Sequence, residues 1–298
     1  GEMTSHRRHD PVFSGMVGVV GASRGTGLQC VLYLAKKKIA CRAIARNPAA
    51  CEKAVCAALP PSLHKLVTYC KADVTDEKTL ELAMSGCQGV IFAATATAGW
   101  TFFESKDTPP AVDFEGSVAC ATAAAGAGVP RFVLISSLAV TRPSNVMHMT
   151  RNSMMGRIMD WKLLGEQGVC KVYETLSKSS TSEMSITIIR PGLLTDAQPL
   201  GPGHLLVDTG DSLSGSMTRA DLGALCCEAL LHADSKGLVF EVVSGKQGGN
   251  YPVCKTYEQV FHSLKNGYIP VTGPNCLQTS GLRGLCGPQD ASSSISCI

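Results

Sequence analysis

Three glycines near the start of the chain carry its strongest chemical signal. Gly21, Gly25 and Gly27 follow the apolar run 17–20 and precede residues 28–35, whose apolar side chains recur at helical spacing. This order predicts a strand, a tight turn and a helix, in which a phosphate approaches bare backbone and the helix dipole favours its negative charge. A glycine-rich turn that binds nothing is the alternative. The residues expected to bind a dinucleotide here are Gly21, Ser23, Arg24, Gly25, Thr26 and Gly27.

The end of the second expected strand, residues 39–45, bears on which dinucleotide is preferred. An NAD site needs a carboxylate roughly twenty residues beyond the glycines to bind the ribose 2′-hydroxyl. This sequence has Arg46 there, and the next carboxylate is Glu52. Arg46 and Arg24 instead offer guanidinium donors to a 2′-phosphate, and at roughly 1.5 kcal/mol per charge-assisted hydrogen bond they favour NADPH by on the order of 100-fold. For Arg46 alone, a solvated arginine at a strand end is the alternative.

Three later apolar runs, at 66–74, 89–96 and 131–140, end in residues suited to line a ligand site. They read as strands of a parallel sheet, and ligands bind at the carboxyl ends of such strands. Asp73 and Val74 would flank the adenine, and the small residues Ala93, Ala94 and Thr95 leave room for a cofactor. A serine hydroxyl, from Ser136 or Ser137, would face the substrate or the nicotinamide unless it only caps the next turn.

Composition excludes several classes of protein. The 298 residues are 45% hydrophobic and carry a net charge of +3, so bulk charge does not support a nucleic-acid partner. The 14 cysteines form no Cys-x-x-Cys pair, which predicts buried thiols in a reducing intracellular compartment and no metal site. No stretch reaches about eighteen uninterrupted apolar residues, so we expect no transmembrane segment.

With these residues in order, the chain resembles the short-chain dehydrogenase/reductase superfamily, and within it the atypical, NmrA-like NAD(P)-binding members of cyanobacteria and plastids. The resemblance covers roughly residues 16–245 and includes the segments 159–166, 188–193 and 219–221. It implies an α/β fold with a doubly wound, mostly parallel Rossmann sheet, NADP as cofactor, and a plastid, another organelle or the cytosol as location. It also adds three residues to the expected cofactor site, Pro191, Gly192 and Leu193.

The same resemblance indicates how the chain is divided. Residues 16–271 would form the Rossmann domain, with a small C-terminal substrate lobe from about 193–217 and 244–271. Residues 1–15 are expected to be an N-terminal arm, and 272–298 an irregular tail that either wanders or lies on a protein partner. The methionine-rich segment 143–157, between the serines and the segment 159–166, is expected to be a loop at the place of a substrate lid. Its methionines would either line an adaptable apolar pocket or only pack the loop.

The catalytic residues implied by the resemblance are incomplete. In the superfamily a serine, a tyrosine and a lysine four residues later act together, the lysine orienting the nicotinamide ribose and lowering the tyrosine pKa. Ser137 and Lys162 match the serine and the lysine, but Ile158 stands at the tyrosine position. Tyr173 lies too far along the helix, and His148 is either a surrogate acid or a surface loop histidine. A missing general acid typically costs about 10²- to 10⁴-fold in rate.

Two functions therefore follow from the sequence. The first is an NADPH-dependent reductase of a small, largely apolar carbonyl or alkene, favoured by Ser137 and Lys162. The second is a non-catalytic NADPH-binding subunit, redox sensor or assembly factor of a larger plastid or respiratory complex, favoured by Ile158 and the aperiodic tail.

Overall fold

The computed structural model describes residues 15–97, 107–177, 184–248 and 251–266. The expected arm, apart from Gly15, and the expected tail lie outside these residues. The strands are β1 (Met16–Val20), β2 (Cys41–Ala45), β3 (Val67–Lys71), β4 (Cys87–Phe92), β5 (Arg131–Ile135), β6 (Ser185–Pro191), β7 (Leu193–Thr195), β8 (Leu205–Asp208), β9 (Ser216–Thr218) and β10 (Val239–Ser244). The longer helices are α1 (Gly25–Lys36), α2 (Pro48–Ala58), α4 (Glu77–Met84), α5 (Gly116–Gly126), α6 (Val146–Met154), α7 (Ile158–Ser177), α8 (Arg219–Leu231) and α9 (Tyr257–Asn266). The short helices are α3 (Pro61–His64), the π-helix η1 (Pro110–Glu115), and the 3-10 turns η2 (Pro202–His204) and η3 (Ala233–Ser235).

One sheet of eight strands organises the described residues, in the order β3-β2-β1-β4-β5-β6-β10-β8. Every pairing in it is parallel except that of β10 with β8. The expected α/β fold with a doubly wound, mostly parallel Rossmann sheet is confirmed. The strand order reverses between β1 and β4, which makes a crevice at their carboxyl ends, the usual place for a ligand in such sheets.

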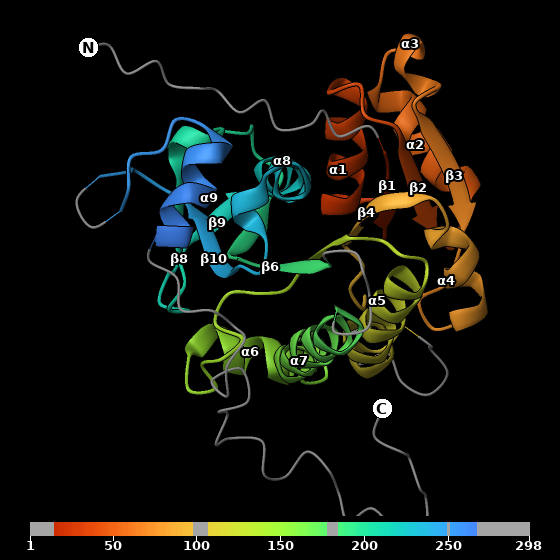
Figure 1. Cartoon of the computed structure of the whole chain (residues 1–298). Coiled ribbons are helices and arrows are strands. Elements are labelled where there is room, and N and C mark those ends of the chain that lie inside the picture. The colour runs from red at the N-terminus through yellow and green to blue at the C-terminus, as the bar shows by residue number, and fades with distance from the viewer. Residues whose placement is uncertain (1–14, 98–106, 178–183, 249–250, 267–298) are drawn as a thin grey trace, which may run out of the picture.

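Helices cover both faces of the sheet (Figure 1). On one face α1 packs against α8, with α2 and α9 in the same core, and on the other face α5 packs against α4 and α7. The strand β1 shows why both faces are filled, because its fully buried Val17 and Val19 belong to the first core and its buried Val20 to the second. The glycine turn between β1 and α1 therefore enters the crevice from the first face, and α7 approaches it from the second.

The expected strand, turn and helix around the glycines are confirmed by β1 and α1, but the region after β5 differs from expectation. The strand expected over 131–140 ends at Ile135, so both serines lie in the loop that follows. The expected loop over 143–157 was wrong, because most of it is the helix α6. Asn145 caps this helix by accepting a 2.9 Å hydrogen bond from the Met147 N–H.

Residues of the expected substrate lobe occupy two places. The short strands β7 and β9 pair in parallel as a separate two-stranded sheet. By contrast β8, also within the expected lobe, is the antiparallel edge of the main sheet. Among the described residues, no helix combines the length and apolar character needed to cross a membrane.

A buried carboxylate joins α1 to α8 and makes the stability of this interface depend on pH. Glu228 accepts a 2.6 Å hydrogen bond from the Tyr33 hydroxyl, lies 2.9 Å from Lys37 Nζ and lies 3.0 Å from His232 Nε2. Burial opposes ionisation of this carboxyl, but its three partners outweigh burial and lower its pKa to about 2.

We expect Glu228 to stabilise the fold above its unfolded pKa of about 4.3, and this stabilisation to be lost as pH falls towards about 2. The depressed pKa corresponds to a contribution of up to about 3 kcal/mol. Urea unfolding at about pH 7 and about pH 3 measures it, and Glu228→Gln should flatten that part of the pH dependence. If the free energy of unfolding changes by the same amount between these two pH values in wild type and in Glu228→Gln, Glu228 is not the source of the pH dependence.

Candidate functional site

The carboxyl ends of β1, β2, β4, β5 and β6 surround one cavity of about 960 Å³. This volume is near the upper end of the range of about 300–1,000 Å³ for small-molecule and cofactor sites. The predicted site residues in its wall are Gly21, Ser23, Arg24, Gly25, Thr26, Arg46, Asp73, Val74, Ala93, Ala94, Thr95, Ser137, Lys162, Pro191 and Gly192. Gly27 lies buried in α1 and Leu193 lies 55% exposed on β7, and neither belongs to the wall. The roles of all these residues stay predictions.

The start of α1 faces the cavity with bare backbone. Gly25 has φ +57°, and a Cβ built there would have only the Arg219 side chain within 4 Å, at 3.8 Å. Arg24, at the N-cap position, makes no side-chain hydrogen bond to the helix, and the first turn holds no acidic residue. The first amides of α1 are thus left for an anion at the positive end of the helix dipole, an arrangement that fits the diphosphate of a dinucleotide.

A guanidinium and a carboxylate meet at the end of β2. Arg46, whose side chain is 58% exposed, lies with its Nη2 3.2 Å from Asp107 Oδ2, and Thr97 donates a hydrogen bond to the same oxygen. Burial opposes ionisation of Asp107, but the hydrogen bonds from Thr97 and Arg46 hold the pKa of this carboxyl below its ordinary value. Asp107 could not be assigned from the sequence, because it lies 61 residues from Arg46 and no motif surrounds it.

Lys162 is held by a buried aspartate that the sequence analysis did not assign to the site. Its Nζ lies 2.7 Å from Asp113 Oδ1, and Asp113 also accepts hydrogen bonds from the Thr95 hydroxyl at 2.8 Å and the Ala96 N–H at 3.0 Å. The Asp113 side chain is fully buried. A Cβ at Gly165 would overlap the carbonyl of Asp113, so this glycine lets α7 approach η1 closely enough for the ion pair to form.

The other residues of the segment 159–166 fasten α7 to its neighbours. Trp161 stacks on Phe114 with ring centroids 6.2 Å apart. One turn beyond Lys162, Glu166 accepts two hydrogen bonds from Arg190 on β6, at 2.6 and 3.0 Å. Ile158, one turn before Lys162, lies on the same helix face and lines the cavity. The motif therefore positions one lysine with a stacked ring, a close contact and a bidentate ion pair.

The two serines after β5 differ in their hydrogen bonds. The Ser137 hydroxyl donates to the carbonyl of Leu138 at 3.3 Å. The Ser136 hydroxyl is buried and has no hydrogen-bond partner among the described residues, although Ser136 lines the cavity. Since a buried hydroxyl without a partner is unfavourable, this atom is suited to a ligand.

Among the described residues that line the cavity there is no tyrosine, histidine, cysteine or glutamate, and the ionisable groups other than arginine are Asp73, Asp107, Asp196 and Lys162. The interpretation of His148 as a surface loop histidine was wrong, since it is only 3% exposed. Its Nδ1 lies 2.9 Å from the carbonyl of Ala139 and its Nε2 3.2 Å from Asp160, outside the cavity wall. Tyr173 is also buried in the core, away from the wall. Neither residue is placed to serve as a surrogate acid in this conformation.

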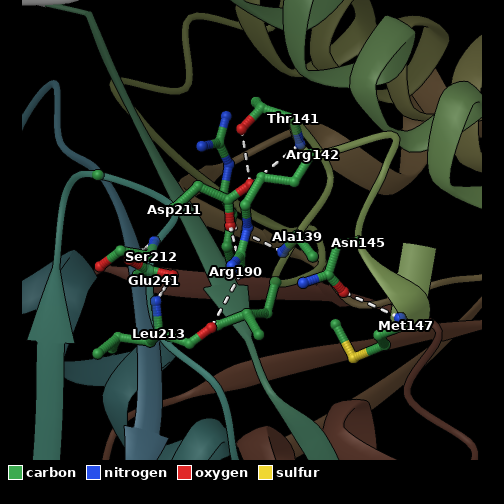
Figure 2. A network of polar contacts seen from close by, with 12 residues as sticks. Ala139, Thr141, Arg142, Asn145, Met147, Arg190, Asp211, Ser212, Leu213 and Glu241 are labelled. Atoms are coloured by element: carbon green, nitrogen blue, oxygen red, sulfur yellow. Dashed lines mark hydrogen bonds and ion pairs between the residues drawn. The ribbon is translucent and has the colours of Figure 1, made fainter.

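A buried carboxylate fixes the loop that carries the serines (Figure 2). Asp211 accepts hydrogen bonds from the Ala139 N–H at 2.7 Å and from the N–H and hydroxyl of Thr141 at 3.0 and 2.6 Å, and lies 3.6 Å from Arg142. Beside it, Glu241 on β10 accepts hydrogen bonds from the two N–H groups that follow Asp211. The part of the loop after β5 that contains Ala139 and Thr141 is thus hydrogen-bonded to the segment after β8, and Glu241 joins that segment to β10.

Comparison with known proteins agrees with this geometry. The family described as NAD(P)H-binding matches residues 21–233. An uncharacterized chloroplastic protein of Arabidopsis thaliana is 29% identical over 256 residues, covering 84% of this chain and 82% of that protein. Sanguinarine reductase of Eschscholzia californica is 27% identical over 210 residues, covering 59% of this chain and 72% of the reductase. A short-chain dehydrogenase/reductase of Veillonella parvula in complex with NADP has a TM-score of 0.54 at 14% identity, covering 80% and 97% of the two chains, a likeness of fold alone.

Proposed function

Because this chain belongs to the NAD(P)H-binding family, we propose that it binds NADPH in preference to NADH and reduces a small, largely apolar carbonyl or alkene. Family membership confirms the resemblance to NAD(P)-binding short-chain dehydrogenase/reductase proteins, while the NmrA-like subgroup stays a prediction. The observation that carries the proposal is that one cavity brings together the uncapped start of α1, Arg46, and the pair Ser137 and Lys162.

Each group would have one task at this cavity. The first amides of α1 bind the diphosphate, and Arg46 with Arg24 binds the 2′-phosphate. Lys162, oriented by Asp113, binds the nicotinamide ribose, and a serine hydroxyl donates to the substrate oxygen. When bound, NADPH supplies the hydride.

The proton has to come from another source than a tyrosine. Ile158 stands where the superfamily has its tyrosine and contributes only an apolar surface to the cavity. We assign the proton to water or to the Lys162 ammonium, which would exchange it with solvent. Without a positioned phenol, turnover should be slower by about 10²- to 10⁴-fold than with one.

The function is tested on the purified full chain. Nucleotide released on denaturation is identified by mass, and NADPH absorbance is then followed with a panel of apolar aldehydes, ketones and conjugated enones. NADP in the released material and NADPH loss that requires an added carbonyl or alkene support a reductase. If the folded protein binds neither NADPH nor NADH, the proposal is wrong.

We expect Arg46→Met to weaken the binding of NADPH by about 10- to 100-fold and the binding of NADH by less than about three-fold. The reason is that only NADPH loses a charge-assisted hydrogen bond. Asp107→Asn should instead strengthen the binding of NADPH, since it removes a carboxylate that lies 3.2 Å from the Arg46 guanidinium and beside the expected 2′-phosphate. Titration calorimetry with both nucleotides measures the two effects.

NADH serves as the matched control for Arg46→Met. Equal loss of both nucleotides, or tighter NADH binding alone in Asp107→Asn, would assign this end of the cavity to the ribose rather than to a 2′-phosphate.

One observation favours a second function, an NADPH-binding subunit or redox sensor without catalysis. The described cavity wall offers an isoleucine where a proton donor is needed. Tight NADPH binding with no turnover over the whole panel, together with copurification of a larger complex, would support this second function over the first.

We also propose a plastid location. The support is that the Arabidopsis thaliana relatives matched in sequence are chloroplastic. Imaging of a fluorescent fusion of the full-length gene product tests it, and a signal confined to the cytosol would contradict it.

A further inference from the structure

Arg151 lines the cavity from α6 and stands apart from the other cations there. Its side chain is partly buried, yet no acceptor for its guanidinium is found among the described residues. Three other cations in the wall each have a carboxylate partner, which is Asp107 for Arg46, Asp113 for Lys162 and Asp196 for Arg219. The remaining one, Arg24, is exposed to solvent. Arg151 is thus the partly buried guanidinium of the wall whose charge the described protein leaves without a partner.

A guanidinium in this position has a cost that an anion would offset. Burial lowers the pKa of Arg151, because water is removed from the charged form. An arginine nevertheless remains protonated in proteins, so the fold holds a partly desolvated cation rather than a neutral side chain. Binding of a planar, bidentate anion such as a carboxylate would restore the missing interactions.

The residues beside Arg151 in the cavity wall indicate what the rest of the bound ligand is like. Met154, Met155 and Ile158 follow it in sequence and line the same cavity. They offer an apolar and adaptable surface. The Ser136 hydroxyl, buried and without a partner, adds a hydrogen-bonding group. A guanidinium, an apolar surface and a hydroxyl together match an amphipathic acid.

The diphosphate of the cofactor is a poor candidate for this anion. The glycine turn and the amides that would bind it belong to α1, whose core lies on one face of the sheet. Arg151 comes from α6, which packs on α7, the helix of the opposite face. The diphosphate therefore has its own site, and Arg151 is available to a second molecule.

We propose that the substrate of this site is an apolar carboxylic acid whose carboxylate is bound by Arg151 while its apolar body lies against Met155 and Ile158. This inference rests on the proposed function, because it takes the rest of the cavity to hold the dinucleotide. It narrows the substrate from any small apolar carbonyl or alkene to one that also carries an acidic group.

The test measures binding of acid and amide pairs to the full chain saturated with NADP⁺. The probes are octanoate, phenylbutyrate and naphthoate, each against its uncharged primary amide, titrated by calorimetry. In wild type at least one acid should bind about 10- to 100-fold tighter than its amide, the effect of one charge-assisted bidentate contact. Arg151→Met should bring that acid to the affinity of its amide, and Arg151→Lys should keep part of the preference.

Lys171→Met is the matched control, since it removes an exposed cation of α7 that does not line the cavity, and it should behave as wild type. The inference is overturned if no acid binds tighter than its amide in wild type, or if Arg151→Met leaves the preference intact. It is also overturned if Arg151→Met weakens the binding of NADP⁺ itself by about ten-fold or more, because the arginine would then bind the cofactor. If the wild-type protein does not bind NADP⁺ in the first titration, it is the proposed function that is contradicted.

Discussion

Replacing Gly25 with Val is expected to abolish measurable binding of both NADPH and NADH while the protein remains folded. The new side chain would project from a backbone position with φ +57° into the open space before α1, where only the Arg219 side chain now approaches within 4 Å. It would cover the amides that the diphosphate needs, so the loss should be at least about 100-fold and equal for the two nucleotides. Titration calorimetry on the purified variant measures it.

The matched control separates this effect from backbone strain. Gly128 also has a positive φ, +74°, and a Cβ there would meet nothing within 4 Å, but it lies after α5 and outside the cavity wall. Gly128→Val should therefore lose similar stability from its backbone, on the order of 1–2 kcal/mol, and bind both nucleotides like wild type. Retention of binding in Gly25→Val would show that the nucleotide does not lie on the start of α1.

Lys162→Met is expected to destabilise the protein by about 3–5 kcal/mol, the typical cost of removing one partner of a buried ion pair. The substitution leaves the Asp113 carboxylate fully buried, and its remaining hydrogen-bond donors among the described residues are the Thr95 hydroxyl and the Ala96 N–H. Adding Asp113→Asn should recover most of the loss, because the amide carries no charge, its oxygen can accept from the Ala96 N–H and its NH2 group can donate to the Thr95 hydroxyl. Urea unfolding of the two single variants and the double variant gives the coupling directly.

Across the single and double variants of Lys162 and Asp113, the affinity for NADPH should change differently from the free energy of unfolding. The double variant regains its fold but not the lysine, so its NADPH affinity should stay as weak as that of Lys162→Met. Lys171→Met, which removes an exposed cation from the same helix, should change neither property. A double variant that is no more stable than Lys162→Met, or one that recovers NADPH affinity, would contradict the assigned role of the Asp113 and Lys162 pair.

Much of the fold could be predicted from local sequence signals. The β1 strand, the turn at Gly21 and Gly25, and the α1 helix were all expected, because glycine spacing and apolar periodicity act within a few residues. The region after β5 was predicted less well. The α6 helix has a weakly apolar sequence, and its start depends on the Asn145 cap and on contacts with α7. Propensity alone therefore favoured a loop there.

The candidate site shows the same division. Sequence patterns named Gly21, Gly25, Arg46, Ser137 and Lys162, and the cavity brings these residues together. They did not name Asp107, which lies 61 residues from Arg46 in the sequence, because a lone carboxylate has no local pattern.

For this protein, the sequence by itself determined the order of the strands from β1 to β5 and the turn whose amides can meet a phosphate, since both follow from the chemistry of neighbouring residues. Only the tertiary structure decided which charges are compensated. Packing of α7 on η1 pairs Lys162 with Asp113, and the segment before η1 brings Asp107 to Arg46. Arg151 reaches the same cavity from α6 and has no such partner among the described residues. Ion pairing depends on distance in space and on burial, neither of which is encoded in local spacing.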